Sequence, residues 1–133
     1  MPRKPPSPID PAEWLRRARS NLARAKSRIP EACLEDLCFD SQQAAEKAVK
    51  AVFIHLAIVF PYTHDLAKLL KLLRRAGLKI PKYLYETKRL TRYAFVTRYP
   101  YSLKPVTEKE YQRSVRIADK AYRWSEKQMK KGP

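Results

Sequence analysis

The sequence predicts an all-α protein built from four long helices plus a shorter one. Three observations lead to this fold class. Apolar residues recur every three or four positions along most of the chain, which is the period of an amphipathic helix. No segment alternates polar and apolar residues as a half-buried strand does. Only two glycines occur in 133 residues, and none forms a glycine-rich phosphate loop.

The first helix is predicted to follow a proline-rich tail. Residues 1–9 contain four prolines and are expected to be disordered or extended, which leaves residues 10–130 as a single domain. Asp10 followed by Pro11 is typical of a helix start, because the carboxylate caps free N–H groups and proline suits the first turn. The helical pattern continues up to Pro30, which ends the helix or bends the connection.

The second helix is expected to run from about Glu31 to about Phe60, where Pro61 stops it. Acidic residues in its first turn suit the helix dipole. The apolar segment 51–60 is too short to cross a bilayer, so it is expected to form a core segment of this helix.

Three further helices complete the prediction. The third should begin with Thr63 as its cap and close at Gly77. Tyr83–Tyr99 is expected to form the fourth, although threonine and aromatic residues are frequent there. Thr107 begins a capping box for the fifth helix, which should reach about Met129.

The charge is strongly unbalanced, with 29 basic against 13 acidic residues and a net charge of +16. Such a surplus attracts polyanions, so nucleic acid, nucleotide or an acidic protein all fit, as does a generally basic surface. The spacing of Cys33 and Cys38 on a helix is unfavourable for a disulfide between them. Two cysteines without clustered histidines also do not form a zinc site. Both are expected to be buried free thiols in a reducing, cytoplasmic setting, and no metal or cofactor is implied. The N-terminus shows no apolar signal segment.

A dense polar patch marks the second helix. Gln43, Glu46, Lys47 and Lys50 fall three, four and seven apart and therefore share one side of it. Small alanines on its other face allow a neighbouring helix to approach closely. The alternative is a solvated face with intrahelical Glu–Lys pairs.

Three segments together resemble HEPN domains, the small stand-alone prokaryotic members in particular. Ser41–Ala51 is similar to the signature of their second helix, Thr63–Leu66 to the motif that opens the third, and Arg98–Pro100 to the arginine-tyrosine-proline element that follows. The resemblance implies an up-and-down antiparallel bundle that commonly dimerises. It also implies pairing with a minimal nucleotidyltransferase in a toxin–antitoxin-like system, with nucleotide binding as one role.

Many HEPN proteins are metal-independent ribonucleases that use an arginine followed, four to six residues later, by a histidine. Neither histidine here has that arginine. Lys50 precedes His55 at the right spacing, but lysine lacks the planar fork that binds phosphate through two bonds. His55 also lies in an apolar segment and is expected to be buried and neutral.

His64 is the better-placed histidine and the candidate catalytic residue. It is predicted to lie in the first turn of the third helix, where free N–H groups favour an anion. The alternative is a structural cap. Arginines beside aromatic residues further along the chain suit phosphate binding with base stacking, whereas Tyr93 and Phe95 are expected to belong to the core. The predicted nucleotide- or phosphate-binding residues are Gln43, Glu46, Lys47, Lys50, Thr63, His64, Arg92, Arg98 and Tyr99.

Three functions remain open. The first is a nucleotide- or RNA-phosphate-binding HEPN protein that works with a minimal nucleotidyltransferase. The second is a ribonuclease toxin that uses His64 with Arg92 or Arg98 supplied across a homodimer. The third is a non-catalytic dimerisation module, in which the polar patch only sets the register. For Arg98 itself, the structural alternative to phosphate binding is a buried pair with Glu46. No membrane association is expected.

Overall fold

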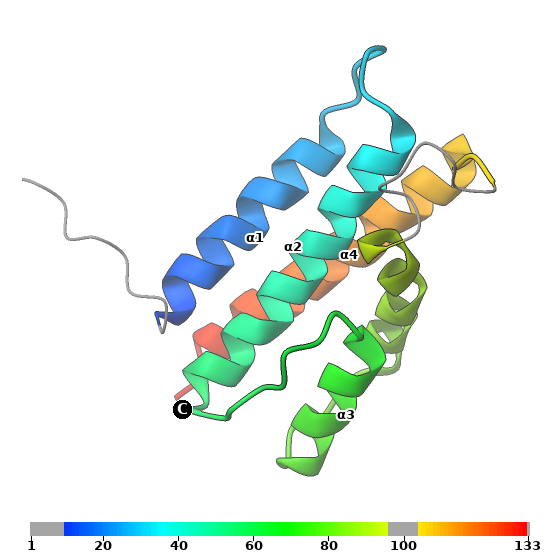
Figure 1. The fold of residues 1–133 in the computed structure, drawn as a ribbon. Coiled ribbons are helices and arrows are strands. Elements are labelled where there is room, and N and C mark those ends of the chain that lie inside the picture. The colour runs from blue at the N-terminus through cyan, green and yellow to red at the C-terminus, as the bar shows by residue number, and fades with distance from the viewer. Residues whose placement is uncertain (1–9, 96–103, 133) are drawn as a thin grey trace, which may run out of the picture.

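A computed structural model describes residues 10–95 and 104–132, and every regular element in this part of the chain is helical, as predicted. The elements are α1 (Pro11–Lys26), α2 (Leu34–His55), α3 (Leu66–Arg75), the 3₁₀ helix η1 (Lys82–Ala94) and α4 (Glu108–Met129). Figure 1 shows α1, α2, η1 and α4 running alternately up and down, with α3 beside η1. Within the described residues, no helix combines the length and apolar character needed to cross a membrane.

Two helix starts lie where capping signals predict them. The Asp10 side chain accepts a hydrogen bond from the Ala12 N–H at 2.9 Å, and Pro11 occupies the first helical position of α1. The Thr107 hydroxyl accepts from the Glu110 N–H at 3.1 Å and begins α4. Both predictions are confirmed because a side-chain acceptor satisfies backbone N–H groups that the helix itself leaves unpaired.

The second helix is shorter at its start than the predicted one. Cys33, rather than Glu31, is its N-cap, and its thiol is exposed. The expectation that both cysteines are buried is therefore wrong for Cys33, which precedes the packed part of α2. Cys38, one turn into the helix, is fully buried as expected.

The second helix also ends early, at His55 instead of Phe60, because Ala57 adopts a left-handed backbone conformation with φ of 56°. The Ile58 N–H bonds to the Phe53 carbonyl at 2.8 Å, and the Ala57 N–H bonds to the Ile54 carbonyl at 3.0 Å. This pair of bonds is the Schellman termination of a helix. After this end the Val59 side chain is 93% exposed, whereas Ile58 and Phe60 still pack against the core.

The third helix begins two residues later than predicted. Its N-cap is Asp65, whose carboxylate accepts from the Lys68 N–H at 3.2 Å. Thr63 instead accepts from the Asp65 N–H at 3.1 Å and so orders the turn before the helix. The end of α3 is confirmed, since Gly77 follows its last turn with φ of 104°.

The predicted fourth helix is a 3₁₀ helix rather than an α-helix over residues 82–94. Four of its five buried residues, Leu84, Thr87, Leu90 and Tyr93, occur at every third position, and Ala94 is the fifth. A 3₁₀ helix has three residues per turn and aligns them on one face, whereas an α-helix would rotate each by about 60° from the last. The Thr87 hydroxyl also donates to the Leu84 carbonyl at 2.7 Å. Residues 96–99 of the prediction lie outside the described residues.

The core is organised around α2, which packs against all four other helices. Its alanines at positions 44, 45, 48 and 51 are fully buried, so these small side chains lie at the contacts with neighbouring helices. Because α2 is covered on most sides, several of its polar residues are enclosed as well. Gln42, Glu46 and Lys50 are at most 6% exposed.

Candidate functional site

A buried hydrogen-bond network is centred on the Glu46 carboxylate, which is 5% exposed. Its Oε1 accepts from the Gln42 side-chain amide at 2.7 Å and lies 2.7 Å from the His64 Nδ1. Its Oε2 accepts from the Lys50 ammonium at 2.9 Å. The alternative prediction of an intrahelical Glu–Lys pair on a solvated face is therefore correct in the pair, Glu46 with Lys50, but this pair is buried and not solvated.

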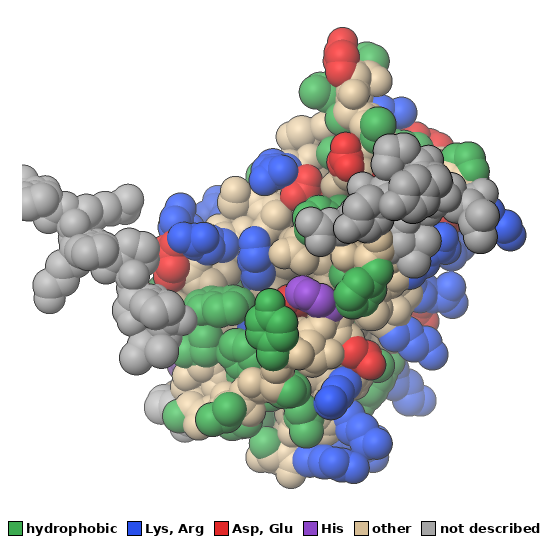
Figure 2. Space-filling view, viewed as in Figure 1, with side chains coloured by type: hydrophobic (Ala, Val, Ile, Leu, Met, Phe, Trp, Pro, Cys, Tyr) green, Lys and Arg blue, Asp and Glu red, His purple; other side chains and the backbone are tan. Residues whose placement is uncertain are grey.

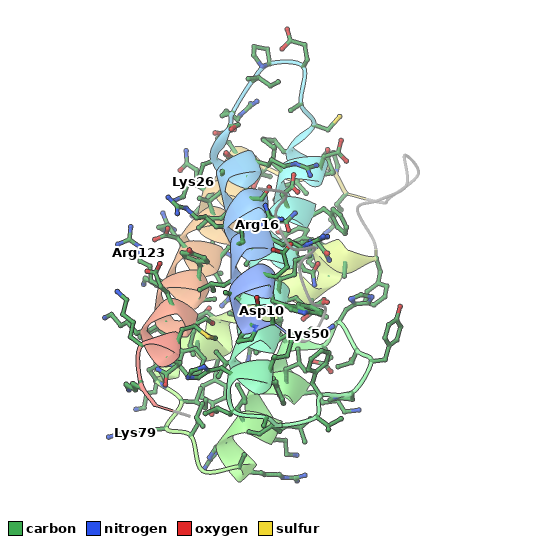
Figure 3. All side chains as sticks on the ribbon, turned by 90° about the vertical axis from the view of Figure 1, so that its left-hand side faces the viewer. Asp10, Arg16, Lys26, Lys50, Lys79 and Arg123 are labelled. Carbon is green, nitrogen blue, oxygen red and sulfur yellow. The ribbon has the colours of Figure 1, made fainter. Side chains whose placement is uncertain are left out.

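An apolar cover lies over the cation of this network. The Lys50 ammonium is 5.2 Å from the centre of the Phe60 ring, which in turn makes edge contacts with Trp14 and Phe53 at 5.7 Å. Figure 3 shows Lys50 reaching from α2 toward the end of α1 that carries Asp10. Removing both charges from water is costly, so the pair depends on its short, complementary hydrogen bonds.

His64 is fixed in orientation by the buried carboxylate. It lies just before the Asp65 cap, so the expectation that it occupies the first turn of α3 is wrong. An ionised carboxylate only accepts hydrogen bonds, so the Nδ1–H donates to it and Nε2 lies at the other edge of the ring. The His64 side chain is 39% exposed.

Two aromatic rings flank His64 at the surface. The Phe95 ring lies 5.5 Å from the imidazole in an edge contact, and the Tyr62 ring lies 6.4 Å away. Tyr62 is 99% exposed and Phe95 55% exposed. The expectation that Phe95 belongs to the core is therefore wrong, because the chain leaves η1 before it. Figure 2 shows a histidine at this surface between hydrophobic side chains.

Lys47 belongs to a second network, which connects α2 with α1. Its ammonium donates to the Asn21 side-chain carbonyl at 2.8 Å, and the Asn21 amide donates to the Asp40 carboxylate at 3.0 Å. Arg24 lies 3.6 Å from the same carboxylate. Burial, with a contribution from the nearby Arg17 cation, lowers the pKa of Lys47. The α1–α2 surface next to the Glu46 network is thus positively charged.

Sequence and structure comparisons place this arrangement in a known family. The HEPN domain profile matches residues 11–128. The chain belongs to the HEPN domain family. TT1696 from Thermus thermophilus has a similar crystal structure, with 31% identity and a TM-score of 0.74 over 90% of this chain and 98% of that one. ST0689, an archaeal HEPN homologue, has 25% identity and a TM-score of 0.73 over 90% and 97%. A comparison with curated proteins found no match.

In this HEPN domain, the predicted site residues fall into separate groups. Gln43 extends the Glu46 network, because its amide donates to the Gln42 side-chain oxygen at 2.7 Å. Thr63 serves the turn before α3. Arg92 lies apart on the η1–α4 side, where its guanidinium is 3.9 Å from the Glu110 carboxylate. Gln42 was not predicted, although its position four residues before Glu46 places it on the same helix side.

Two predicted residues of the HEPN domain, Arg98 and Tyr99, lie outside the described residues, so the phosphate-binding role of Arg98 stays a prediction and its pairing with Glu46 the untested alternative. Tyr93 is 5% exposed and belongs to the core as expected. His55 is partly buried, and its Nε2 lies 2.9 Å from the Lys131 carbonyl oxygen, to which it donates. Residues 10–95 and 104–132 contain no group of three His, Cys, Asp or Glu side chains placed to hold a metal ion.

Proposed function

We propose that this HEPN protein binds the phosphate-bearing part of a nucleotide or RNA at the surface around His64. One observation carries the proposal. The buried Glu46 carboxylate holds the imidazole through Nδ1, while the His64 side chain is 39% exposed and lies beside the exposed rings of Tyr62 and Phe95. If Nε2 takes up a proton, the ring donates to Glu46 on one side and to a phosphate oxygen on the other.

The surroundings of His64 suit a ligand with both a base and a phosphate. An exposed aromatic ring offers a stacking surface to a base of any identity. The cations Arg17, Arg24 and Lys47 lie together where α1 meets α2, and the whole chain carries a charge of +16. A negatively charged ligand is therefore attracted to this side of the molecule.

The proposed setting is a homodimer that acts together with a minimal nucleotidyltransferase, in a toxin–antitoxin-like pair. Membership of the HEPN family supports this part of the proposal, since HEPN domains commonly dimerise. The exposed apolar side chains of Val59, Tyr62 and Phe95 are further support, because a protein partner would remove them from water.

A ribonuclease that acts through His64 is the second candidate. A carboxylate bonded to one ring nitrogen leaves the other nitrogen free to accept a proton, which is the arrangement of an oriented general base. RNA cleavage also needs a group that stabilises the phosphate, and here it would be Arg92 or Arg98 of a second copy. The missing arginine–histidine spacing makes the binding role the better supported one.

The test compares the two histidines. We expect His64→Gln to weaken binding of AMP and ATP, measured by calorimetry, by about tenfold or more, because a charged hydrogen bond to phosphate contributes roughly 1.5–3 kcal/mol. His55→Gln is the matched control and should leave both affinities unchanged. Tyr62→Ala should also weaken binding, since base stacking contributes about 1–3 kcal/mol.

Equal affinities for His64→Gln and His55→Gln would exclude the proposed site. Incubation of the purified protein with a labelled oligouridine decides between the two candidates. Cleavage that His64→Gln abolishes and His55→Gln retains would establish the ribonuclease. Binding without cleavage supports the non-catalytic role.

A further inference from the structure

We infer that the groove between η1 and α4 binds the phosphate backbone of a single-stranded nucleic acid. The groove shares no lining residue with the network around Glu46 and His64, so either site can be disproved without the other. Two adjoining hollows of about 200 and 290 Å³ form it, and Arg89, Arg113 and Ile117 line both. The remaining lining residues are Leu90, Arg92, Tyr93, Glu110 and Ser114 in one hollow and Tyr83, Glu86, Arg116 and Lys120 in the other.

Cations line both walls of the groove at helical spacing. Arg113, Arg116 and Lys120 are three and four residues apart, so they share one side of α4. Arg89 and Arg92 are three apart, which is one turn of the 3₁₀ helix, and so they share one side of η1. Together these five cations face two carboxylates, Glu86 and Glu110. Figure 2 shows basic side chains along the edge where Figure 1 places η1.

The cations of the groove are available to a ligand. Within residues 10–95 and 104–132, no salt bridge involves Arg113, Arg116 or Lys120. Arg89 pairs with Glu86 at 2.6 Å, but both side chains are 52% exposed. Exposed ion pairs of this kind contribute only about 0–1 kcal/mol, so a phosphate can replace the carboxylate at little cost. A guanidinium also matches two phosphate oxygens at once.

Aromatic side chains favour a nucleic acid over an acidic peptide as the occupant. Tyr83 is 44% exposed at the groove, with the Lys120 ammonium 5.9 Å from its ring centre. A base can therefore stack beside a cation that binds its phosphate. Tyr93 lies on the inner side, where burial raises its pKa to about 12. Its phenol stays neutral at physiological pH and does not repel phosphate.

The experiment measures binding of a fluorescein-labelled oligouridine of about 12 nucleotides, a length typical of single-strand sites, by fluorescence anisotropy at several salt concentrations. We expect Arg89→Gln/Arg113→Gln to lower the affinity by about tenfold or more and to reduce the slope of log K against log salt by about 1.4, because each single-strand phosphate contact contributes about 0.7. The exposed pair Arg116→Gln/Lys120→Gln should act in the same direction without affecting folding.

The matched control is Arg74→Gln/Arg75→Gln, which removes two exposed cations at the end of α3 and so changes the net charge equally. It should lower the affinity by less than about threefold, roughly the effect of net charge alone. An equal loss of affinity in groove and control variants would mean that RNA binds to the basic surface as a whole and not specifically to the groove. Unchanged affinity in the groove variants would exclude the site. Oligoglutamate that binds as tightly as oligouridine would overturn the nucleic-acid assignment in favour of an acidic protein.

Discussion

At the scale of the residue, Glu46 connects α2 with the loop that follows it. Its two oxygens accept from an amide, an ammonium and an imidazole, and the imidazole comes from the loop between α2 and α3. Because the carboxylate is almost completely buried, its charge is balanced by Lys50 rather than by water. The surface position of His64 therefore depends on an ion pair in the interior.

This dependence leads to a prediction about stability. We expect Glu46→Leu to lower the free energy of unfolding by about 3–5 kcal/mol, because the Lys50 charge would remain buried without a partner. Adding Lys50→Met removes that charge, so the double variant should be more stable than Glu46→Leu alone. Urea unfolding of both variants and of Lys50→Met completes the double-mutant cycle. A double variant no more stable than the single one would show that the pair is not coupled.

The sequence allowed part of this site to be predicted. Helical spacing is enough to place Gln43, Glu46 and Lys50 on one side of α2. Spacing cannot show that Glu46 and Lys50 are buried, because an exposed helix face carries the same pattern of charges. The contact with His64 depends on the path of the loop after Ala57, which no short-range pattern specifies.

At the scale of the element, two helices end with the same hydrogen bonds but with different residues. After α2, Ala57 holds the left-handed conformation, and after α3, Gly77 does. In both cases a following N–H bonds back to a carbonyl in the last turn, from Ile58 to Phe53 and from Leu78 to Leu73. Glycine adopts this conformation without the steric cost that a Cβ atom causes.

The two ends can be tested with reciprocal substitutions. We expect Ala57→Gly to raise the free energy of unfolding by about 1 kcal/mol and Gly77→Ala to lower it by about the same amount, since a left-handed non-glycine residue costs roughly 1–2 kcal/mol. A Cβ atom at position 77 would meet no other atom within 4 Å, so the loss of stability in Gly77→Ala would measure the cost of the backbone conformation and not a steric clash. Thermal unfolding measures both, and a destabilising Ala57→Gly would refute the account.

Helix boundaries could be predicted at Asp10, Thr107 and Gly77, where a capping residue or a glycine marks them, whereas α2 and α3 begin later than predicted. Asp10 and Thr107 are local signals, because their side chains accept hydrogen bonds from backbone N–H groups of the first turn. The early end of α2 depends on a left-handed alanine, and alanine is a residue type that normally continues a helix. The three-residue repeat of Leu84, Leu90 and Tyr93 is present in the sequence of η1. A spacing of three is also tolerated on an α-helix, so the repeat was consistent with the wrong helix type.

At the scale of the whole molecule, the charge of +16 acts on folding as well as on ligands. A compact chain brings these like charges closer together than an unfolded one does, and the repulsion opposes folding. Surface ion pairs such as Lys26 with Asp119, at 2.9 Å, offset only part of it.

Stability should therefore rise with salt. We expect the melting temperature to increase when sodium chloride is raised from about 10 to about 150 mM, because the screening length falls from roughly 30 to 8 Å. Arg74→Gln/Arg75→Gln, which lowers the net charge, should show a smaller increase. A melting temperature that is flat or falls with salt would mean that ion pairs outweigh repulsion. A rise with sulfate but not with chloride would point instead to bound anions.

The three-residue repeat of η1 also sets a distance. Thirteen residues at about 2.0 Å each extend roughly 26 Å, whereas the same residues in an α-helix would extend only about 20 Å. The buried side chains hold the longer form, because an α-helical coil would turn half of them toward solvent. Phe95, which follows η1 and contacts His64, therefore lies at a distance from the start of η1 that the packing of the core sets. A single-residue deletion within 82–94 would shorten that distance and move Phe95 away from His64.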